Sequence, residues 1–143
     1  MALRILIADD NPAARVVVRS LFATDEFDVV GEAGDGRQAL SLSRRLRPDI
    51  AILDLAMPRM DGLEAAHQIR RRCPATRVIL LSEHHSEDLV KGAFRAGARA
   101  YVVKTDSPDD LVRAVKEVAA GRIYLSPSAS RFLIQSHLPK NGG

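Results

Sequence analysis

The chain has 143 residues, of which 46% are hydrophobic and 27% charged, and it contains a single cysteine. This length and apolar content fit one globular domain and exclude a disordered chain. The lone Cys73 excludes internal disulfides and a cysteine-based metal site. No apolar run reaches the length of a membrane span, and the N-terminus carries no signal-like segment. We therefore expect a cytoplasmic protein that makes no membrane contact.

The formal net charge of +3 lies at one end of the chain. Basic and acidic residues balance in residues 1–121, and the tail 122–143 carries the whole excess. A neutral body with a lightly basic tail gives little support to DNA binding by the globular part. Two basic runs, Arg44–Arg45–Arg47 and Arg70–Arg71–Arg72, close helical patterns. Each is interpreted either as a helix end whose cations complement the helix dipole or, less readily, as a phosphate-binding patch.

Short apolar runs alternate with helical patterns along the chain. The runs are Leu3–Ala8, Asp28–Gly31, Ile50–Leu53, Val78–Leu81 and Ala100–Val103. Most of them are nearly continuous rather than alternating, which is typical of parallel strands covered on both faces.

The segments between these runs begin with residues that cap helices. The predicted starts are Asn11–Pro12, Asp35, Asp61, Ser86 and Ser107–Pro108. Apolar residues follow at helical spacing, and the predicted stops are Pro48, Pro74, Gly97 and Gly121. Beyond the last helix, Ser126–Pro127 is a suitable start for one more short helix through Leu138, and we expect residues 139–143 to be disordered.

Five strands alternating strictly with five helices predict a doubly wound α/β fold. At this size we expect the flavodoxin-like form, with a five-stranded parallel sheet in the order 2-1-3-4-5. We accordingly divide the chain into one domain over residues 1–121 and a linker or tail over residues 122–143.

Polar residues follow the predicted strands at their carboxyl ends, where ligands bind in such sheets. They are Asp9 and Asp10 after the first strand, Asp54 after the third, Ser82 after the fourth and Lys104 after the fifth. The first and third strands flank the point where the strand order reverses, so the three aspartates should meet there. Each residue alone has an ordinary explanation as a cap, a turn residue or a surface lysine, but their joint placement favours a site.

Three carboxylates in one cleft repel one another and raise each other's pKa unless a cation joins them. Mg²⁺ suits such a group, since it takes one or two carboxylates together with waters and phosphate oxygens. Lys104 adds a positive charge and Ser82 a hydroxyl donor. This inventory points to phosphoryl transfer, in which a carboxylate can itself be the nucleophile. With no evident strong base, the site should hold a phosphoryl group rather than turn substrate over quickly.

Several strings of residues resemble the receiver domain of bacterial two-component response regulators. They are Ile5-Leu6-Ile7-Ala8-Asp9-Asp10, Asp54-Leu55-Ala56-Met57-Pro58-Arg59-Met60-Asp61-Gly62, Leu80-Leu81-Ser82, Gly97-Ala98-Arg99-Ala100-Tyr101 and Val103-Lys104. The resemblance covers residues 3–121. It implies that Asp54 is the residue phosphorylated by a histidine kinase and that Lys104 contacts the phosphoryl group.

The resemblance also implies the remaining roles in the site. Mg²⁺ would be coordinated by Asp10, Asp54 and the backbone carbonyl of Ala56, with Asp9 acting largely through water. Ser82 and Tyr101 would form a switch pair, in which the hydroxyl turns onto the phosphate and the ring follows it from an exposed position. Such a chain is a signalling phosphoacceptor, not an enzyme beyond its own phosphorylation and slow dephosphorylation.

The segment Gly121-Arg122-Ile123-Tyr124-Leu125-Ser126-Pro127 is similar to the NarL/FixJ class, in which a LuxR-type DNA-binding domain follows. The chain stops where that domain would begin. We therefore expect a receiver fragment of a transcription regulator that contacts DNA only through an output domain absent here. A partner or a second copy of the chain would dock near residues 86–121.

Three alternative functions remain. A stand-alone receiver and a phosphorylation-independent interaction module would use the same fold, although such a module usually lacks one of Asp10, Asp54 or Lys104. A Mg²⁺-dependent aspartyl phosphatase usually has a second Asp two residues after the first, where this chain has Ala56.

Overall fold

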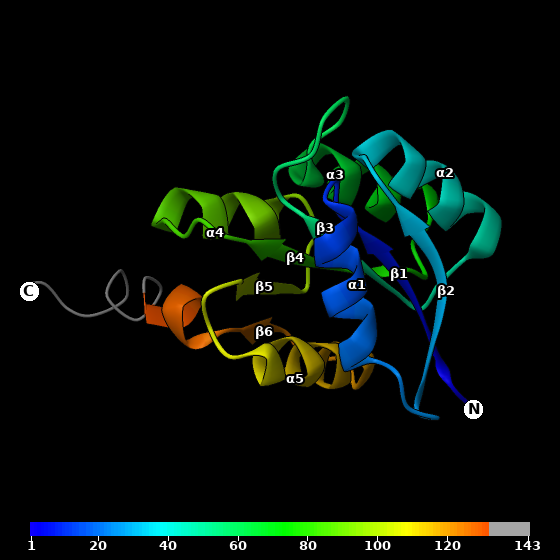
Figure 1. Ribbon diagram of the computed structural model, residues 1–143. Helices are drawn as coiled ribbons and strands as arrows, with labels where there is room; N and C mark the ends of the chain where they lie inside the picture. Colours follow the sequence, from blue (N-terminus) through cyan, green and yellow to red (C-terminus); the bar gives the residue numbers. More distant parts are fainter. Residues whose placement is uncertain (132–143) are drawn as a thin grey trace, which may run out of the picture.

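The computed structural model describes residues 1–131 and shows one parallel sheet between two layers of helices (Figure 1). The strand order is β2-β1-β3-β4-β5-β6. The strands are β1 (Leu3–Ala8), β2 (Phe27–Ala33), β3 (Ile50–Asp54), β4 (Arg77–Ser82), β5 (Ala100–Val103) and β6 (Tyr124–Leu125). All neighbouring strands pair in parallel.

Helices α1 to α5 cover both faces of the sheet and form two cores with it. They are α1 (Pro12–Leu21), α2 (Gly36–Leu46), α3 (Gly62–Arg72), α4 (Glu87–Arg95) and α5 (Pro108–Ala119). Alternate residues of each strand point to opposite faces. Ile5 and Ile7 of β1 therefore pack with α1 and α5, while Leu6 and Ala8 pack with α2, α3 and α4. This arrangement explains the continuous apolar runs, because both faces of β1, β3, β4 and β5 are buried.

The predicted helix starts are confirmed by the cap geometry. The side chains of Asn11, Asp35, Asp61, Ser86 and Ser107 each accept a hydrogen bond from a backbone N–H in the first turn of the helix that follows. These bonds satisfy donors that have no partner within the helix. Each helix therefore starts directly after a strand end or its loop, which keeps the connections short.

The predicted order 2-1-3-4-5 is confirmed, but the count of five strands and five helices is wrong. The sheet has a sixth strand, β6, and a sixth helical segment begins at residues 127–131. The additional strand forms because the outer edge of β5 offers unpaired backbone groups. Tyr124 N donates to Arg99 O at 3.0 Å, and Ser126 N donates to Tyr101 O at 3.1 Å. A strand of two residues has no hydrophobic period that a sequence could display.

Side chains fasten the segment after β6 to the loop that follows β5. The hydroxyl oxygen of Ser126, which is fully buried, accepts a hydrogen bond from Val103 N at 2.9 Å. Ser128 donates to the Asp106 carboxylate through its N–H at 3.0 Å and its hydroxyl at 2.6 Å. The expected helix from Ser126 thus begins as predicted, while the rest of it and residues 139–143 lie outside the described residues.

The described helices include none that is long and apolar enough to cross a membrane.

We predict that the Ser126 hydroxyl stabilises the fold. Replacing it in Ser126→Ala leaves the buried Val103 N–H without a partner, so we expect the free energy of unfolding to fall by about 1–3 kcal/mol in urea denaturation. Ser130→Ala is the matched control, because its half-buried hydroxyl bonds only to the carbonyl of Pro127 nearby. Equal stability of the two variants would contradict the anchoring role of Ser126.

Candidate functional site

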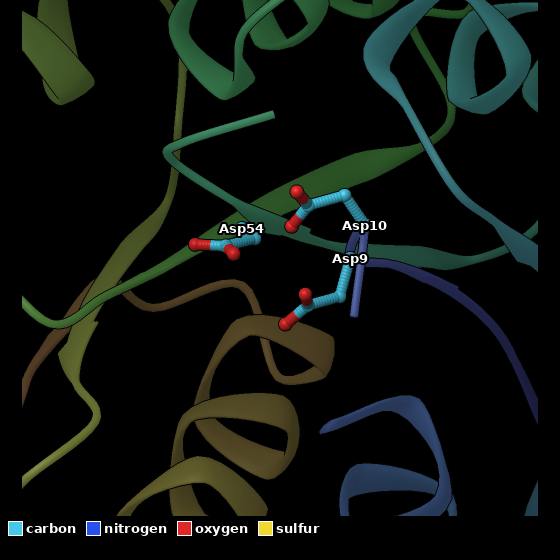
Figure 2. A group of neighbouring side chains, drawn as sticks. All are labelled: Asp9, Asp10 and Asp54. Atoms are coloured by element: carbon cyan, nitrogen blue, oxygen red, sulfur yellow. The ribbon is translucent and has the colours of Figure 1, made fainter. Parts of the chain in front are cut away.

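Three aspartates meet at the carboxyl end of the two central strands, as predicted. Asp9 and Asp10 follow β1, and Asp54 is the last residue of β3, which pairs directly with β1. One carboxylate oxygen from each lies within 4.8 Å of the others. Figure 2 shows the three side chains converging from these two strand ends. Asp9 and Asp54 are buried and Asp10 is exposed, so the group opens to solvent on one side.

Lys104 supplies the positive charge of the site and approaches the carboxylates from the end of β5. It follows β5, and its Nζ lies 3.1 Å from Asp9 Oδ2 and 3.3 Å from Asp54 Oδ2. The ammonium group is half-buried and bridges two buried carboxylates. Three carboxylates against one ammonium leave negative charge uncompensated. An oxygen-rich group of this kind suits a hard divalent cation.

Burial and the neighbouring charges shift the pKa of both Asp54 and Lys104. Burial raises the pKa of Asp54 above its ordinary value, the Lys104 charge opposes this, and Asp9 adds to it. Burial alone would lower the pKa of Lys104, but the charges of Asp54 and Asp9 outweigh it and raise that pKa. Repulsion from Asp9 thus contributes to the raised pKa of Asp54, as the sequence predicts, and loss of solvent is the larger cause.

The loop after β3 is held tightly against the strand end. Gly62 N donates to Leu55 O at 2.8 Å, and a Cβ on Gly62 would lie 2.4 Å from the carbonyl oxygen of Asp54. Only glycine fits at this distance. Ala56 N points to Asp54 Oδ1 at 3.4 Å. The close approach explains why the string from Asp54 to Gly62 is so specific.

Ser82 and Tyr101 contact the same short segment behind the carboxylates. The Ser82 hydroxyl oxygen, buried at the end of β4, accepts a hydrogen bond from His84 N at 3.0 Å. The phenol of Tyr101 donates to His84 O at 2.7 Å. Burial raises the pKa of Tyr101, and the Ser82 hydroxyl opposes the shift. The expectation that the Tyr101 ring starts from an exposed position is wrong, because this side chain is fully buried in the α2–α3–α4 core.

The predicted site residues line a cavity of about 400 Å³, with the exception of Tyr101. The Tyr101 side chain is buried in the core instead. The lining of the cavity includes Asp9, Asp10, Asp54, Ala56, Ser82 and Lys104.

Sequence reasoning missed two groups that hold Asp9 in place. Asn11 N donates to Asp9 Oδ1 at 2.9 Å, and Arg15 Nη1 donates to Asp9 O at 2.5 Å. Arg15 also pairs with Glu32 at 3.2 Å. The only sign of the contact between Arg15 and Asp9 in the sequence is that Arg15 lies one turn into the helix that follows Asp9.

The raised pKa of Asp54 predicts a pH-dependent stability. A carboxyl whose pKa is higher in the folded state favours folding while it is protonated, and its ionisation at neutral pH opposes folding. In the absence of divalent cations, Asp54→Asn should therefore be more stable than the parent at pH 7, by about 1 kcal/mol. The difference should shrink as the pH falls into the ordinary carboxyl range. Asp28→Asn, which removes an exposed carboxylate, is the control in denaturation experiments, and a less stable Asp54→Asn variant at pH 7 would refute the argument.

Comparisons with known proteins give the same result as the geometry. The chain is 38% identical over 134 residues to the nitrate/nitrite response regulator NarL of Escherichia coli, covering 92% of this chain and 62% of NarL. It thus spans about three fifths of the length of that relative. A LuxR-family two-component response regulator from Aurantimonas superposes with a TM-score of 0.92 at 34% identity, covering 97% of this chain and all of the other.

A structure of RcsB dimers bound to DNA superposes with a TM-score of 0.85 at 25% identity, covering 94% of this chain and 69% of the RcsB chain. The family model of the response regulator receiver domain matches residues 5–116. This match includes the three aspartates, Ser82, Tyr101 and Lys104. The chain therefore belongs to the response regulator receiver domain family.

Proposed function

We propose that this chain accepts a phosphoryl group on Asp54 from a histidine kinase. The observation that carries the proposal is the Asp54 carboxylate at the floor of an open cavity, 3.3 Å from the Lys104 ammonium and beside two further carboxylates. Residues 1–121 contain all of these groups. We propose them as the phosphoacceptor unit and residues 122–143 as its connection to an output.

The transfer follows from the position of the carboxylate. An Asp54 oxygen attacks phosphorus and forms a P–O bond, while the bond from phosphorus to the donor's imidazole nitrogen breaks and leaves its electron pair on that nitrogen. Lys104 and Ala56 N both contact the Asp54 carboxylate, and they would contact oxygens of the incoming group. Such charge-assisted contacts stabilise the charge of the transferred phosphoryl group. Slow hydrolysis by water then returns the carboxylate.

The same residues fit Mg²⁺ as the cofactor. Asp10, Asp54 and the Ala56 carbonyl would hold the ion, and Asp9 would act through water. When bound, Mg²⁺ neutralises charge on the phosphoryl oxygens. The fit rests on the all-oxygen donor set and on the negative charge that Lys104 alone leaves uncompensated.

Relatives of greater length support a role in transcription. NarL is a response regulator, and the RcsB structure contains dimers on DNA. We propose that this receiver controls a LuxR-type output domain that binds DNA, with no DNA contact required of the receiver for that role. We also propose a homodimer as one signalling state.

The phosphorylation itself is tested with acetyl phosphate and Mg²⁺. Intact-mass spectrometry should show one added phosphoryl group on the parent chain and on the control Asp28→Asn, and none on Asp54→Asn. Addition of the group to Asp54→Asn, or its absence from the parent, would overturn the proposal.

The metal assignment gives a separate prediction. Asp10→Ala should abolish Mg²⁺ binding in a calorimetric titration and leave the melting temperature nearly unchanged, because Asp10 is exposed. Binding should be weak even in the parent, since waters fill most of the coordination shell without phosphate. Asp25→Ala, another exposed site, is the control. An unchanged titration in Asp10→Ala would remove Asp10 from the ligand set.

We propose that Ser82 and Tyr101 carry the signal away from the site. The phosphoryl group adds about two negative charges and three acceptors, and the Ser82 hydroxyl can donate to it while still accepting from His84 N. His84 O is already held by the Tyr101 phenol. Any movement of Ser82 therefore alters the loop before α4 together with the buried ring.

Ser82→Ala should accept the phosphoryl group and fail to transmit it. Amide chemical shifts across residues 86–121, with and without the phosphoryl mimic beryllofluoride, should respond much less in this variant than in the parent. Ser41→Ala, an exposed serine on α2, should respond as the parent does. A full response in Ser82→Ala would show that the coupling runs elsewhere.

A further inference from the structure

A groove of about 810 Å³ runs between α2, the end of α3 and the loop that precedes β4. Arginines from two separate parts of the sequence line it: Arg37, Arg44, Arg45, Arg47 and Arg72. Leu40, Met60 and Pro74 add apolar surface. The groove shares no lining residue with the acidic cavity, and one of its loops, residues 73–76, precedes β4 at the opposite end of the sheet. We call it the arginine groove.

The guanidinium groups of the arginine groove are not neutralised. None of the five forms an ion pair within residues 1–131, and none of the residues lining the groove is acidic. Other arginines of the same chain do find partners, since Arg15 and Arg19 pair with Glu32 and Arg59 pairs with Asp35. All five groove arginines are exposed. Five like charges around one groove repel one another unless an anion joins them.

Helix dipoles explain only part of this cluster. Arg44 and Arg45 in the last turn of α2, and Arg72 in the last turn of α3, complement the dipole of their own helix. Arg37 lies in the first turn of α2, where a positive charge is unfavourable. Arg47 adopts a left-handed backbone conformation, with φ of 49°, at a position where glycine is favoured. The dipole explanation also gives no reason for Arg72 to line the same groove as the arginines at the end of α2.

We propose that the arginine groove binds a small organic anion that carries two or more phosphate groups. Guanidinium groups match phosphate oxygens through paired hydrogen bonds. A phosphate brings up to two negative charges in a small volume. A ligand with several phosphates can therefore balance the charge of five arginines, whereas a single carboxylate cannot. The volume of the groove lies in the range of small-molecule sites, and its apolar residues can contact the remainder of the ligand.

Inorganic tripolyphosphate and ATP are the probes, in buffer without divalent cations so that the acidic cavity does not take part. Both should bind in calorimetric titrations, and amide shifts should change in residues 37–47 and 72–76. Arg44→Gln/Arg72→Gln should bind at least about tenfold more weakly. The control Arg71→Gln/Arg95→Gln removes two exposed arginines from helix ends outside the groove and should bind as the parent does.

Three results would overturn the proposal. Equal weakening in both double variants would show general charge attraction, and shift changes centred on other residues would place the ligand elsewhere. Stronger binding of a short DNA duplex than of tripolyphosphate, lost in Arg44→Gln/Arg72→Gln, would make the ligand a nucleic acid backbone instead. Thermal melting of both double variants, with transitions close to the parent, verifies that they are folded.

Discussion

The ammonium group of Lys104 lies between the carboxylates of Asp9 and Asp54, and this contact is the constraint around which the site is arranged. Two carboxylates this deeply buried are unfavourable without a nearby cation, and the lysine reaches them from β5 across β4. Such a cluster holds only if rigid elements fix its members. The buried strands β1, β3 and β5 provide this rigidity, because the residues before Asp9, Asp54 and Lys104 are fully packed.

The cluster also lowers the stability of the fold, because it buries charge. Burial raises the pKa of Asp54 while Lys104 restrains the shift. The Asp54 carboxylate is mostly withdrawn from solvent, although it lines the acidic cavity. Sites of this kind commonly sacrifice folding free energy for function. Here the unbalanced negative charge is also what suits the cavity to a hard divalent cation.

Most of the fold and of the acidic site could be predicted, because short-range signals specify them. Apolar runs, capping residues such as Asn11 and Asp61, and the close approach at Gly62 are properties of neighbouring residues in the sequence. Once the strand order follows from fold rules, the meeting of Asp9 with Asp54 follows too. The roles given to these residues by family resemblance remain predictions.

What could not be predicted depends on contacts between distant segments. β6 forms through backbone groups of β5, which leave no pattern in side chains. The Tyr101 phenol bonds to the carbonyl of His84, and the sequence does not specify this partner. The two basic runs each had a sufficient local explanation, so the approach of Arg72 to Arg37 and to the arginines at the end of α2 became visible only in three dimensions.

β6 has a further consequence, for the behaviour of the protein in solution. An uncovered strand edge is a template on which other chains can add strands. β6 closes that edge of the sheet with only two residues, and Ser126 then occupies the Val103 N–H. A chain cut before Tyr124 would keep every residue of the acidic site yet expose an apolar, flat β5 to its neighbours. The C-terminal boundary of a domain that stays monomeric in solution is therefore set by the need to avoid aggregation, not by the residues of the acidic site. This boundary lies after β6 and Ser126, which pair with the edge of β5.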